Sequence, residues 1–323
     1  IIKLINKITK NLNKKIIIVI LSQVTPGFTR KIKWPHNKLY YQVETLIFGK
    51  ALDRALNQER IIIGSKTSGQ KIELFYKEYL KSFNAPIIKM NYESAELAKI
   101  SINMLLISNI TISNYLSTIC AKIGADWLSI LPSLRLDKRI GKHSYIEPGL
   151  GLTGGNLERD IYTLEKISKK LKIKNSLLNS FFSISNDQRK WVHLILKKYI
   201  NNNTKLKISI LGLSYKEKTN SIKNSPSISI LEDFKNIKFT VYDPLIKNIK
   251  NKNVQFAENI NDLILDSDIL IIMNKSNDFK KIKKNVLLKK MNYRKIIIDP
   301  FAILKELNLS DFGFKYYRLG SFN

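Results

Sequence analysis

The chain has 323 residues, of which 44% are hydrophobic and 10% aromatic, so it is long enough for two or three domains and too apolar for a disordered protein. No uninterrupted apolar run reaches the roughly 18 residues of a membrane-spanning helix. The single cysteine, Cys120, excludes an internal disulfide and a cysteine-based metal cluster, and the three histidines are too scattered to share a metal ion. These features favour a cytoplasmic globular protein with neither a metal site nor a membrane partner.

The charge is strongly basic, at +29, but its make-up does not point to nucleic acid. Only nine of the 55 basic residues are arginines, and the lysines are spread along the chain together with abundant Asn and Ile. This combination indicates an A/T-rich coding sequence, whereas nucleic-acid binding more often brings arginines and clustered charge. We therefore do not expect a nucleic-acid partner, although a basic surface would attract an anionic substrate.

Residues 1–68 alternate between helical and strand patterns over short stretches. The expected elements are a helix over 1–13 and strands over 15–21, 38–43 and 60–64. Alternation on this scale is typical of part of an α/β unit. The chain starts at Ile1 with neither an initiator methionine nor the layout of a signal peptide, so we expect an internal start in a longer chain.

Residues 69–203 are helical by pattern, with a long, mostly apolar helix expected over 94–126 and another over 174–200. Within the first of these, Lys99 and Asn103 are four residues apart and therefore lie on one helix face. Polar groups in an apolar helix cost free energy unless something pairs with them. The pair is therefore either a solvated stripe or a group that faces a ligand.

Residues 204–323 return to an α/β pattern after a polar break at 201–203. Four buried strands are expected, over 207–213, 239–244, 268–273 and 295–299. The first of them ends at a glycine turn. This part of the chain predicts a second α/β domain.

The stretch from Ile146 to Asp160 holds four of the 13 glycines, just ahead of a helical pattern that starts at Ile161. A glycine-dense loop that leads into a helix suits an anion or a reacting centre, although a structural turn that caps the helix explains it equally well. Residues 149–154 also spell G-x-G-x-x-G. They lack both the preceding strand and the later acidic residue on a second strand, so we do not interpret them as a dinucleotide-binding turn.

The same stretch resembles the catalytic loop of the nucleotide-sugar dehydrogenases, the family of UDP-glucose and UDP-N-acetylmannosamine 6-dehydrogenases. The family pattern is P-G-x-G-x-G-G-S-C-F-P-K-D, in which the cysteine is the nucleophile. The matching positions are Pro148, Gly149, Gly151, Gly154 and Asp160. The cysteine position holds Asn156 and the lysine position holds Arg159.

Further family motifs recur in the same order along almost the whole chain. They are V-I-L-S-Q-V-T-P-G at 19–27, Q-V-E-T-L-I-F-G-K-A at 42–51, R-I-I-I-G at 60–64, S-A-E-L-A-K-I-S-I-N at 94–103, D-K-R-I-G at 137–141, L-G-L-S-Y-K-E-K-T at 211–219 and Y-D-P at 242–244. One such match alone would be weak, but their order makes the resemblance specific.

The resemblance implies an α/β fold in three parts: the remnant of an N-terminal dinucleotide-binding Rossmann domain over 1–68, a central all-helical dimerisation domain over 69–203, and a C-terminal Rossmann-like UDP-binding domain over 204–323. It implies an NAD-dependent oxidoreductase that acts on a UDP-sugar as a homodimer. The family's own G-x-G-x-x-G turn would lie upstream of Ile1.

The resemblance also implies roles for particular residues. The catalytic candidates are Lys99, Asn103, Asp160, Glu44 and, at the cysteine position, Asn156. The substrate-binding candidates are Arg139, Gly149, Gly151, Gly154, Gly155, Tyr215 and Lys216. The cofactor-binding candidates are Gln23, Pro26 and Lys223, the last at a position where the family has arginine.

Asn156 limits the chemistry that these residues can perform. In the family, the first oxidation gives an aldehyde, and a cysteine thiolate captures it before the second oxidation. An amide is not a nucleophile, so the covalent step is lost. The sequence therefore predicts a divergent dehydrogenase that stops after one oxidation. The alternative is a non-catalytic relative that binds sugar nucleotides.

Overall fold

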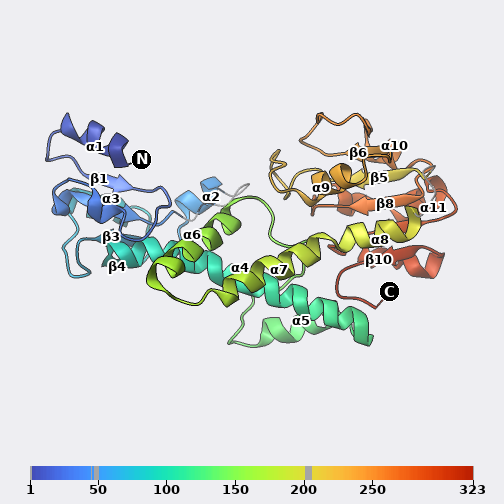
Figure 1. Ribbon diagram of the computed structural model, residues 1–323, viewed down its shortest axis with the longest axis horizontal. Helices are drawn as coiled ribbons and strands as arrows, with labels where there is room; N and C mark the ends of the chain where they lie inside the picture. The colour runs from blue at the N-terminus through green and yellow to red at the C-terminus, as the bar shows by residue number, and fades with distance from the viewer. Residues whose placement is uncertain (1, 45, 47–50, 201–205, 323) are drawn as a thin grey trace. The chain divides into compact units, whose positions relative to one another are not determined.

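The computed structural model describes residues 2–44, 46, 51–200 and 206–322. The chain divides into two compact units, Ile1–Leu105 and Leu106–Asn323. Helix α4 (Tyr92–Ile123) runs through the boundary as one continuous helix (Figure 1). The domain limits expected at 68/69 and 203/204 do not coincide with this division and stay predictions.

The first unit is built on a four-stranded sheet in the order β1-β2-β3-β4, in which only β2 and β3 pair antiparallel. Its elements are α1 (Ile2–Lys10), β1 (Ile18–Ile20), β2 (Leu39–Gln42), α2 (Ala51–Leu56), β3 (Ile61–Ser65), α3 (Leu74–Lys81) and β4 (Ile87–Asn91), with 3₁₀ turns at Thr29–Lys31 and His36–Lys38. Successive side chains of a strand point to opposite faces. Tyr41 therefore packs with Tyr92 of α4, whereas its neighbour Tyr40 packs with Tyr76 of α3. These two contacts anchor one helix to each face of the sheet.

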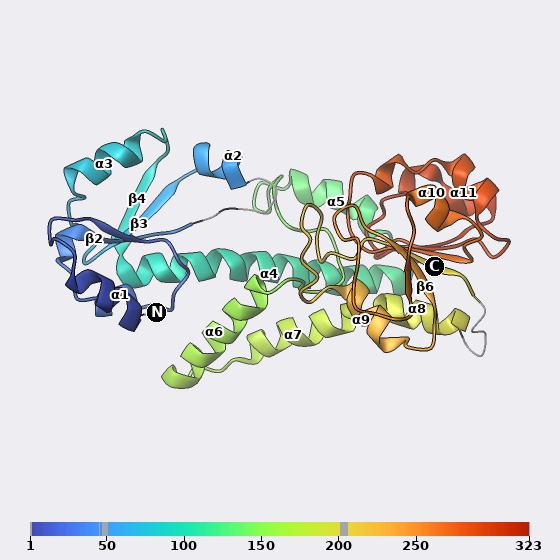
Figure 2. The same cartoon turned by 90° about the horizontal axis from the view of Figure 1, so that it is seen from above.

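The second unit contains a six-stranded parallel sheet in the order β10-β9-β8-β5-β6-β7. Its strands are β5 (Ile208–Leu211), β6 (Phe239–Tyr242), β7 (Val254–Phe256), β8 (Ile269–Ile272), β9 (Ile296–Ile298) and β10 (Lys315–Tyr317). Helices α8 (Trp191–Ile200) and α9 (Pro226–Asp233) cover one face, and α10 (Ile260–Ile264) and α11 (Lys284–Lys290) cover the other (Figure 2). The 3₁₀ turns of this part are at Phe279–Lys281, Lys305–Leu307 and Leu309–Phe312. The chain enters the sheet at β5 and places β6 on one side of it and β8 on the other, so the strand order reverses between β5 and β8.

The helical part of the second unit consists of the second half of α4 together with α5 (Trp127–Leu136), α6 (Asn156–Leu171) and α7 (Ser176–Arg189). The guanidinium of Arg318, after β10, donates to both carboxylate oxygens of Asp126 at 2.8 and 2.9 Å. The amide of Trp127 donates to the carbonyl of Gly320 at 2.8 Å. These bonds tie the start of α5 to the end of the chain, so that the helices and the parallel sheet form one unit.

The predicted α/β fold with a helical centre is confirmed, and the errors lie in individual elements. The sequence missed β4, β7 and β10, and all three are edge strands. Their side chains are half-buried or exposed, so they lack the continuous apolar run that marks a central strand. The helix expected over 174–200 is two helices separated at Lys190, and α6 begins at Asn156, five residues before the predicted pattern.

Helix α4 is long and apolar enough to cross a membrane by length and composition, with a mean hydropathy of 1.3 over its best window. Core helices of soluble proteins meet the same test. Polar side chains within α4, such as Asn114 and Ser117, are buried against protein and hydrogen-bonded there. Only 33% of that window is buried in the structure, so length and composition by themselves assign α4 to neither class.

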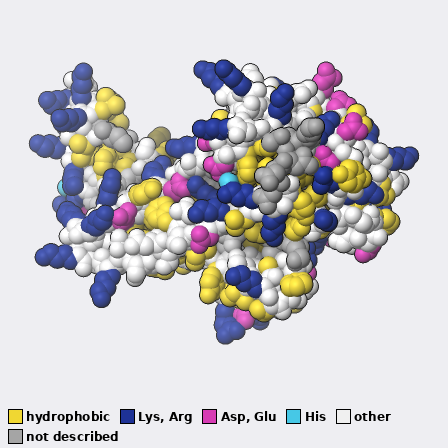
Figure 3. All heavy atoms as spheres, turned by 45° about the vertical axis from the view of Figure 1, so that its right-hand side comes forward, with side chains coloured by type: hydrophobic (Ala, Val, Ile, Leu, Met, Phe, Trp, Pro, Cys, Tyr) yellow, Lys and Arg dark blue, Asp and Glu magenta, His cyan; other side chains and the backbone are white. Residues whose placement is uncertain are grey.

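The basic charge does not gather in one place on the face shown in Figure 3. Lys and Arg side chains occur over all of that face, separated by hydrophobic and uncharged surface. On this face, the distribution agrees with a compositional origin for the basic charge.

Candidate functional site

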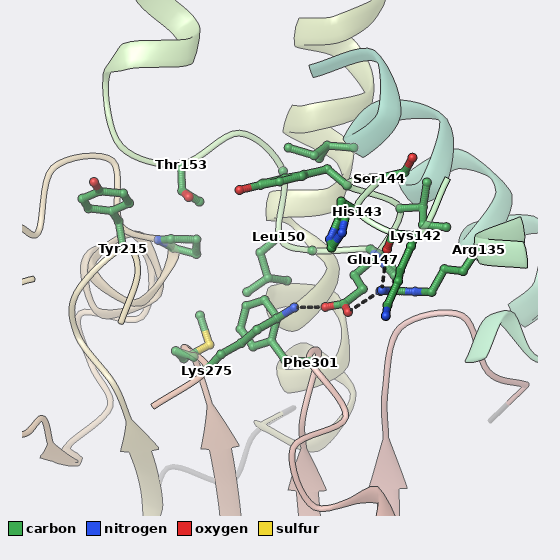
Figure 4. A pocket seen from close by; sticks show the side chains of 18 residues that line it. Arg135, Lys142, His143, Ser144, Glu147, Leu150, Thr153, Tyr215, Lys275 and Phe301 are labelled. Carbon is green, nitrogen blue, oxygen red and sulfur yellow. Dashed lines mark hydrogen bonds and ion pairs between the residues drawn. The ribbon is translucent and has the colours of Figure 1, made fainter. Parts of the chain in front are cut away.

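A cavity of about 460 Å³ lies in the second unit, between residues 142–153 and the carboxyl ends of the parallel strands. Tyr215, Lys275 and Phe301 line it from the segments that follow β5, β8 and β9 (Figure 4). Ligands of open α/β sheets bind at the carboxyl edge where the strand order reverses. The cavity occupies that position, because the reversal lies between β5 and β8.

The charged lining of the cavity consists of three cations and one carboxylate. Arg135, Lys142 and Lys275 are the cations, and Glu147 is the carboxylate. The carboxylate accepts from the Arg135 guanidinium at 2.8 Å through one oxygen and from the Lys275 ammonium at 2.5 Å through the other (Figure 4). Burial alone would raise the pKa of Glu147, but Lys275 and Arg135 together hold that pKa below its ordinary value. The cavity therefore has an excess of positive charge, as a site for a phosphorylated ligand requires.

Buried polar side chains from two helices fix the glycine loop that forms one wall. The Asn114 side-chain oxygen on α4 accepts from the amide of Gly149 at 2.8 Å, and the Ser185 hydroxyl on α7 accepts from the amide of Leu152 at 2.8 Å. Gly151 lies between them at φ +76°, a left-handed conformation that side chains other than glycine rarely adopt. The loop is therefore held rigidly by residues that sequence reasoning missed. For Asn114 the only signal is a polar residue inside the mostly apolar helix α4, and Ser185 carries no such signal because α7 is rich in polar residues.

Residues 215–224 of the α/β part pack against the end of this loop. A Cβ at Gly154 would lie 2.8 Å from the Tyr215 ring, and a Cβ at Gly155 would lie 2.9 Å from the Lys223 ammonium nitrogen. Asn224 donates to the carbonyl of Gly154 at 2.7 Å. Gly154, at φ +76° and against the Tyr215 ring, is a position where other residues are strained, whereas at Gly155 the end of the flexible Lys223 side chain can move aside. Lys223 is brought beside the residue that precedes α6.

Asn156 is the first residue of α6 and its side chain is exposed. The first turn of a helix presents amides without helical partners and the positive end of the helix dipole, so a group at this position can approach an anion. Asp160 follows one turn later and is fully buried, with an oxygen 3.6 Å from the guanidinium of Arg159.

Two domain models of one family match the chain. The central-domain model of the UDP-glucose/GDP-mannose dehydrogenase family matches residues 93–187, and the UDP-binding-domain model matches residues 209–306. Together they cover more than half of the chain, in the order expected. The chain belongs to the UDP-glucose/GDP-mannose dehydrogenase family.

Individual relatives agree with this assignment. UDP-glucose 6-dehydrogenase TuaD of Bacillus subtilis is 28% identical over 287 residues, which are 86% of this chain and 60% of that protein. UDP-glucose 6-dehydrogenase of Rickettsia bellii is 28% identical over 333 residues, which are 98% of this chain and 76% of that protein. The chain therefore spans about three fifths to three quarters of the length of these relatives.

Solved structures show the same fold. A UDP-D-ManNAc dehydrogenase from Pyrococcus horikoshii superimposes with a TM-score of 0.81 at 22% identity, over 99% of this chain and 76% of that chain. A UDP-glucose dehydrogenase from Pyrobaculum islandicum gives a TM-score of 0.78 at 20% identity, over 95% of this chain and 71% of that chain.

In this family member, the predicted residues fall into two groups that belong to different units. The cavity of the second unit brings together Gly149, Gly151 and Tyr215, and Gly154, Gly155 and Lys223 lie at the end of the same loop. Lys216 follows Tyr215 and is half-buried.

Arg139 belongs to an exposed turn after α5, where its guanidinium pairs with Asp137 at 2.6 Å. The arginine that lines the cavity is Arg135, one turn earlier. The expected role of Arg139 in substrate binding stays a prediction.

The remaining candidates lie in the first unit. Lys99 and Asn103 are on α4, and both take part in interactions with neighbouring groups. Gln23 and Pro26 lie in the segment after β1, and the half-buried Glu44 accepts from the amide of Leu46.

A carboxylate that sequence reasoning did not single out organises the segment after β1. Glu96 is fully buried on α4 and accepts from the amides of Gly27 at 2.5 Å and Thr29 at 2.7 Å. Glu96 therefore fixes the turn that contains Pro26. Glu96 is part of the family motif at 94–103, in which the sequence had indicated functional roles only for Lys99 and Asn103.

Among the described residues, no group of three His, Cys, Asp or Glu side chains is placed to hold a metal ion. Cys120 is buried next to Trp127 and Leu131, and burial raises the pKa of its thiol. A thiol in this position is a packing group, as its helical apolar surroundings in the sequence indicate.

Proposed function

We propose that this chain acts as a nucleotide-sugar dehydrogenase that binds a UDP-sugar in the cavity of the second unit and oxidises one sugar hydroxyl once. The observation that carries the proposal is the basic cavity at the strand reversal of the UDP-binding domain, walled by the family's glycine loop. The relatives named UDP-glucose 6-dehydrogenase and the UDP-binding-domain match support a UDP-sugar as the ligand.

In this proposal, the cavity cations hold the diphosphate. Arg135 and Lys275 offer charge-assisted donors from opposite sides, and Lys142 adds a third positive charge. The fixed glycine loop then directs the sugar toward the start of α6. Tyr215, whose pKa is raised by burial, stays protonated at neutral pH and is able to donate a hydrogen bond.

The chemical roles of Lys99, Asn103 and Asp160 are proposed from the family resemblance. A lysine ammonium stabilises the negative charge that develops on an alcohol oxygen, and an amide adds a hydrogen bond. A carboxylate takes up the proton or orients a water that does so. Asn156 supplies no nucleophile for a second oxidation, which is why we propose a single step.

NAD is the cofactor that the family implies, and when bound it supplies the hydride acceptor. The C-terminal α/β part does not fit it. Asp243, at the end of the second strand of the parallel sheet, occupies the place where dinucleotide folds hold the ribose. Its two oxygens accept instead from the amides of Leu213 and Ser214 and from those of Leu245 and Ile246, at 2.8 to 3.2 Å.

The glycine turn of this sheet is closed as well. A Cβ at Gly212 would lie 2.6 Å from the side chain of Asn274, which covers the point where a pyrophosphate approaches such a turn. The C-terminal α/β part is therefore Rossmann-like in topology but does not offer a dinucleotide site.

A non-catalytic UDP-sugar-binding protein is the second candidate, and the exposed amide of Asn156 at the nucleophile position favours it. The two candidates share the cavity and differ in turnover. In a form of the protein that binds NAD, formation of NADH from a UDP-sugar supports the enzyme, whereas tight binding without NADH supports the binding protein.

We further propose a cytoplasmic homodimer that forms through α4. Leu105, Ile112 and Tyr115 recur at helical spacing along α4 with exposures of 69%, 50% and 52%. Apolar side chains repeated along one helix face are typical of a surface that another helix covers. A second copy of the chain offers the same surface.

Titration of residues 1–323 with UDP by calorimetry tests the site. We expect saturable binding that weakens about tenfold in Lys275→Met, because the substitution removes a charge-assisted donor. Lys281→Met is the matched control, since Lys281 is an exposed lysine of the same sheet domain that pairs with Asp278 away from this cavity. Equal affinities for the two variants, or no binding of UDP by the unaltered chain, contradict the proposed site.

A further inference from the structure

The carboxylate of Glu147 bridges two cations at the boundary between two cavities. One is the cavity described above, and the other, of about 300 Å³, extends toward Leu128 and Leu131 of α5. Arg135, Glu147 and Lys275 line both cavities. Figure 4 shows the three side chains converging, with Glu147 in the middle. We refer to this arrangement as the Glu147 bridge.

The bridge is held by charge rather than by packing. The side chain of Glu147 is 50% exposed, and those of Arg135 and Lys275 are 37% and 39% exposed. Space on both sides leaves the carboxylate room to move away from its partners. Ion pairs with this exposure are weak, about 0.2 to 1 kcal/mol each, so a stronger anion can break them.

A phosphate group presents to Arg135 and Lys275 the same kind of acceptor as the carboxylate does. Both are anionic oxygens that take charge-assisted hydrogen bonds, and a diphosphate brings more charge than the single charge of Glu147. A free diphosphate at this point would also face the negative charge of Glu147, unless that carboxylate leaves. Binding of the diphosphate and departure of the Glu147 carboxylate are therefore coupled.

We propose that Glu147 is an internal stand-in for the diphosphate of the ligand, which displaces it from Arg135 and Lys275 on binding. This inference rests on the proposed function, because it takes the cavity to be the UDP-sugar site. Without ligand, Glu147 keeps the two cations compensated. On binding, its carboxylate exchanges for phosphate oxygens and moves into solvent or into the adjoining cavity.

The exchange makes Glu147 a residue that sets specificity. Every ligand that binds to Arg135 and Lys275 must break the Glu147 bridge. Only a group with enough negative charge compensates for the two ion pairs that are lost. Uridine lacks phosphate and so cannot displace Glu147. UDP and inorganic pyrophosphate both carry the required charge.

The test is calorimetric titration of residues 1–323 and of Glu147→Gln with UDP, inorganic pyrophosphate and uridine. The amide keeps the shape of the side chain but removes the charge that competes with the ligand. We expect Glu147→Gln to bind UDP and pyrophosphate about tenfold more tightly than the unaltered chain, with any binding of uridine unchanged. Thermal unfolding of both proteins establishes that the variant is folded.

Asp278→Asn is the matched control for general charge, because Asp278 is an exposed carboxylate of the same domain that pairs with Lys281 and not with the cavity cations. We expect its affinity for UDP to stay within about twofold of the unaltered chain. If Asp278→Asn raises the affinity for UDP as much as Glu147→Gln does, the overall charge of the protein explains the effect and the exchange is refuted. If Glu147→Gln raises the affinity for uridine as much as the affinity for UDP, a change in cavity shape explains the effect and the exchange is refuted.

The failures of the two proposals are distinguishable. If UDP binds neither the unaltered chain nor Glu147→Gln, the proposed site fails and the exchange fails with it. If UDP binds both proteins equally while Lys275→Met weakens binding, the proposed site stands and the exchange alone is refuted.

Discussion

Replacement of Gly151 by alanine should destabilise the second unit strongly. Gly151 has φ +76°, which costs an alanine about 1 to 2 kcal/mol. Its new Cβ would lie 2.4 Å from the carbonyl oxygen of Ser185 and 2.7 Å from the Ser185 hydroxyl oxygen. The backbone must shift to relieve these contacts, and the shift breaks the bond from the Leu152 amide to that hydroxyl, worth about 1 kcal/mol. With the cost of overpacking, the expected loss of unfolding free energy is about 3 to 5 kcal/mol.

Urea unfolding, followed by tryptophan fluorescence and circular dichroism, measures this loss, and Gly149→Ala is the matched control. A Cβ at Gly149 would lie 3.8 Å from the Phe301 ring, an ordinary contact, and the residue does not have a positive φ. The control should therefore change stability by no more than about 0.5 to 1 kcal/mol, in either direction. UDP affinity, measured on the folded fraction, should fall in Gly151→Ala and persist in Gly149→Ala. Equal stability of the two variants would falsify the reasoning, because it would mean that the loop is not held against α7 as described.

Two further predictions concern the start of α5 and the start of α6. Burial opposes ionisation of Asp126, but the hydrogen bonds from Arg318 and from the Leu128 amide outweigh burial and lower the pKa of Asp126 below its ordinary value of 3.8. The Asp126–Arg318 pair therefore adds stability above about pH 4, and this stability is lost as the pH falls through the folded-state pKa. Asp126→Asn should therefore lower the free energy of unfolding by about 1 kcal/mol at neutral pH and leave it unchanged in acid. Asp126→Ala should lower it by about 1 kcal/mol more at every pH, because this substitution also removes the N-cap of α5. Urea unfolding curves at a series of pH values test this, and a difference between Asp126→Asn and the unaltered chain that stays constant with pH contradicts the pairing. In a protein of this family with asparagine at position 156, we expect one NADH per UDP-sugar, rising toward two in Asn156→Cys; two NADH from the asparagine form would show that another group performs the capture of the aldehyde.

Tertiary structure, not local pattern, decided the geometry of the candidate site. Arg135, Glu147 and Lys275 are separated by 12 and 128 residues along the chain and belong to no short motif. Their meeting depends on α5 packing beside the strand ends, which the Asp126–Arg318 pair fixes. Asn114 and Ser185 likewise acquire their role only when α4 and α7 enclose the glycine loop.

The sequence by itself determined the elements that fold from local pattern. Central strands such as Ile208–Leu211 are continuous apolar runs because both faces of a parallel sheet are buried, and α4 is a long apolar stretch that ends at Gly124 with φ +79°. The order of the motifs also determined the family, and through it the glycine loop and Asn156. The edge strands β4, β7 and β10 escaped detection because their side chains are half-buried or exposed, which leaves too little apolar signal. The edge strand β1 was predicted because residues 15–21 are a mostly apolar run. The basic cavity escaped detection because charged side chains far apart in the sequence carry no periodic signal, and only the folding of the chain at the strand reversal brings them together.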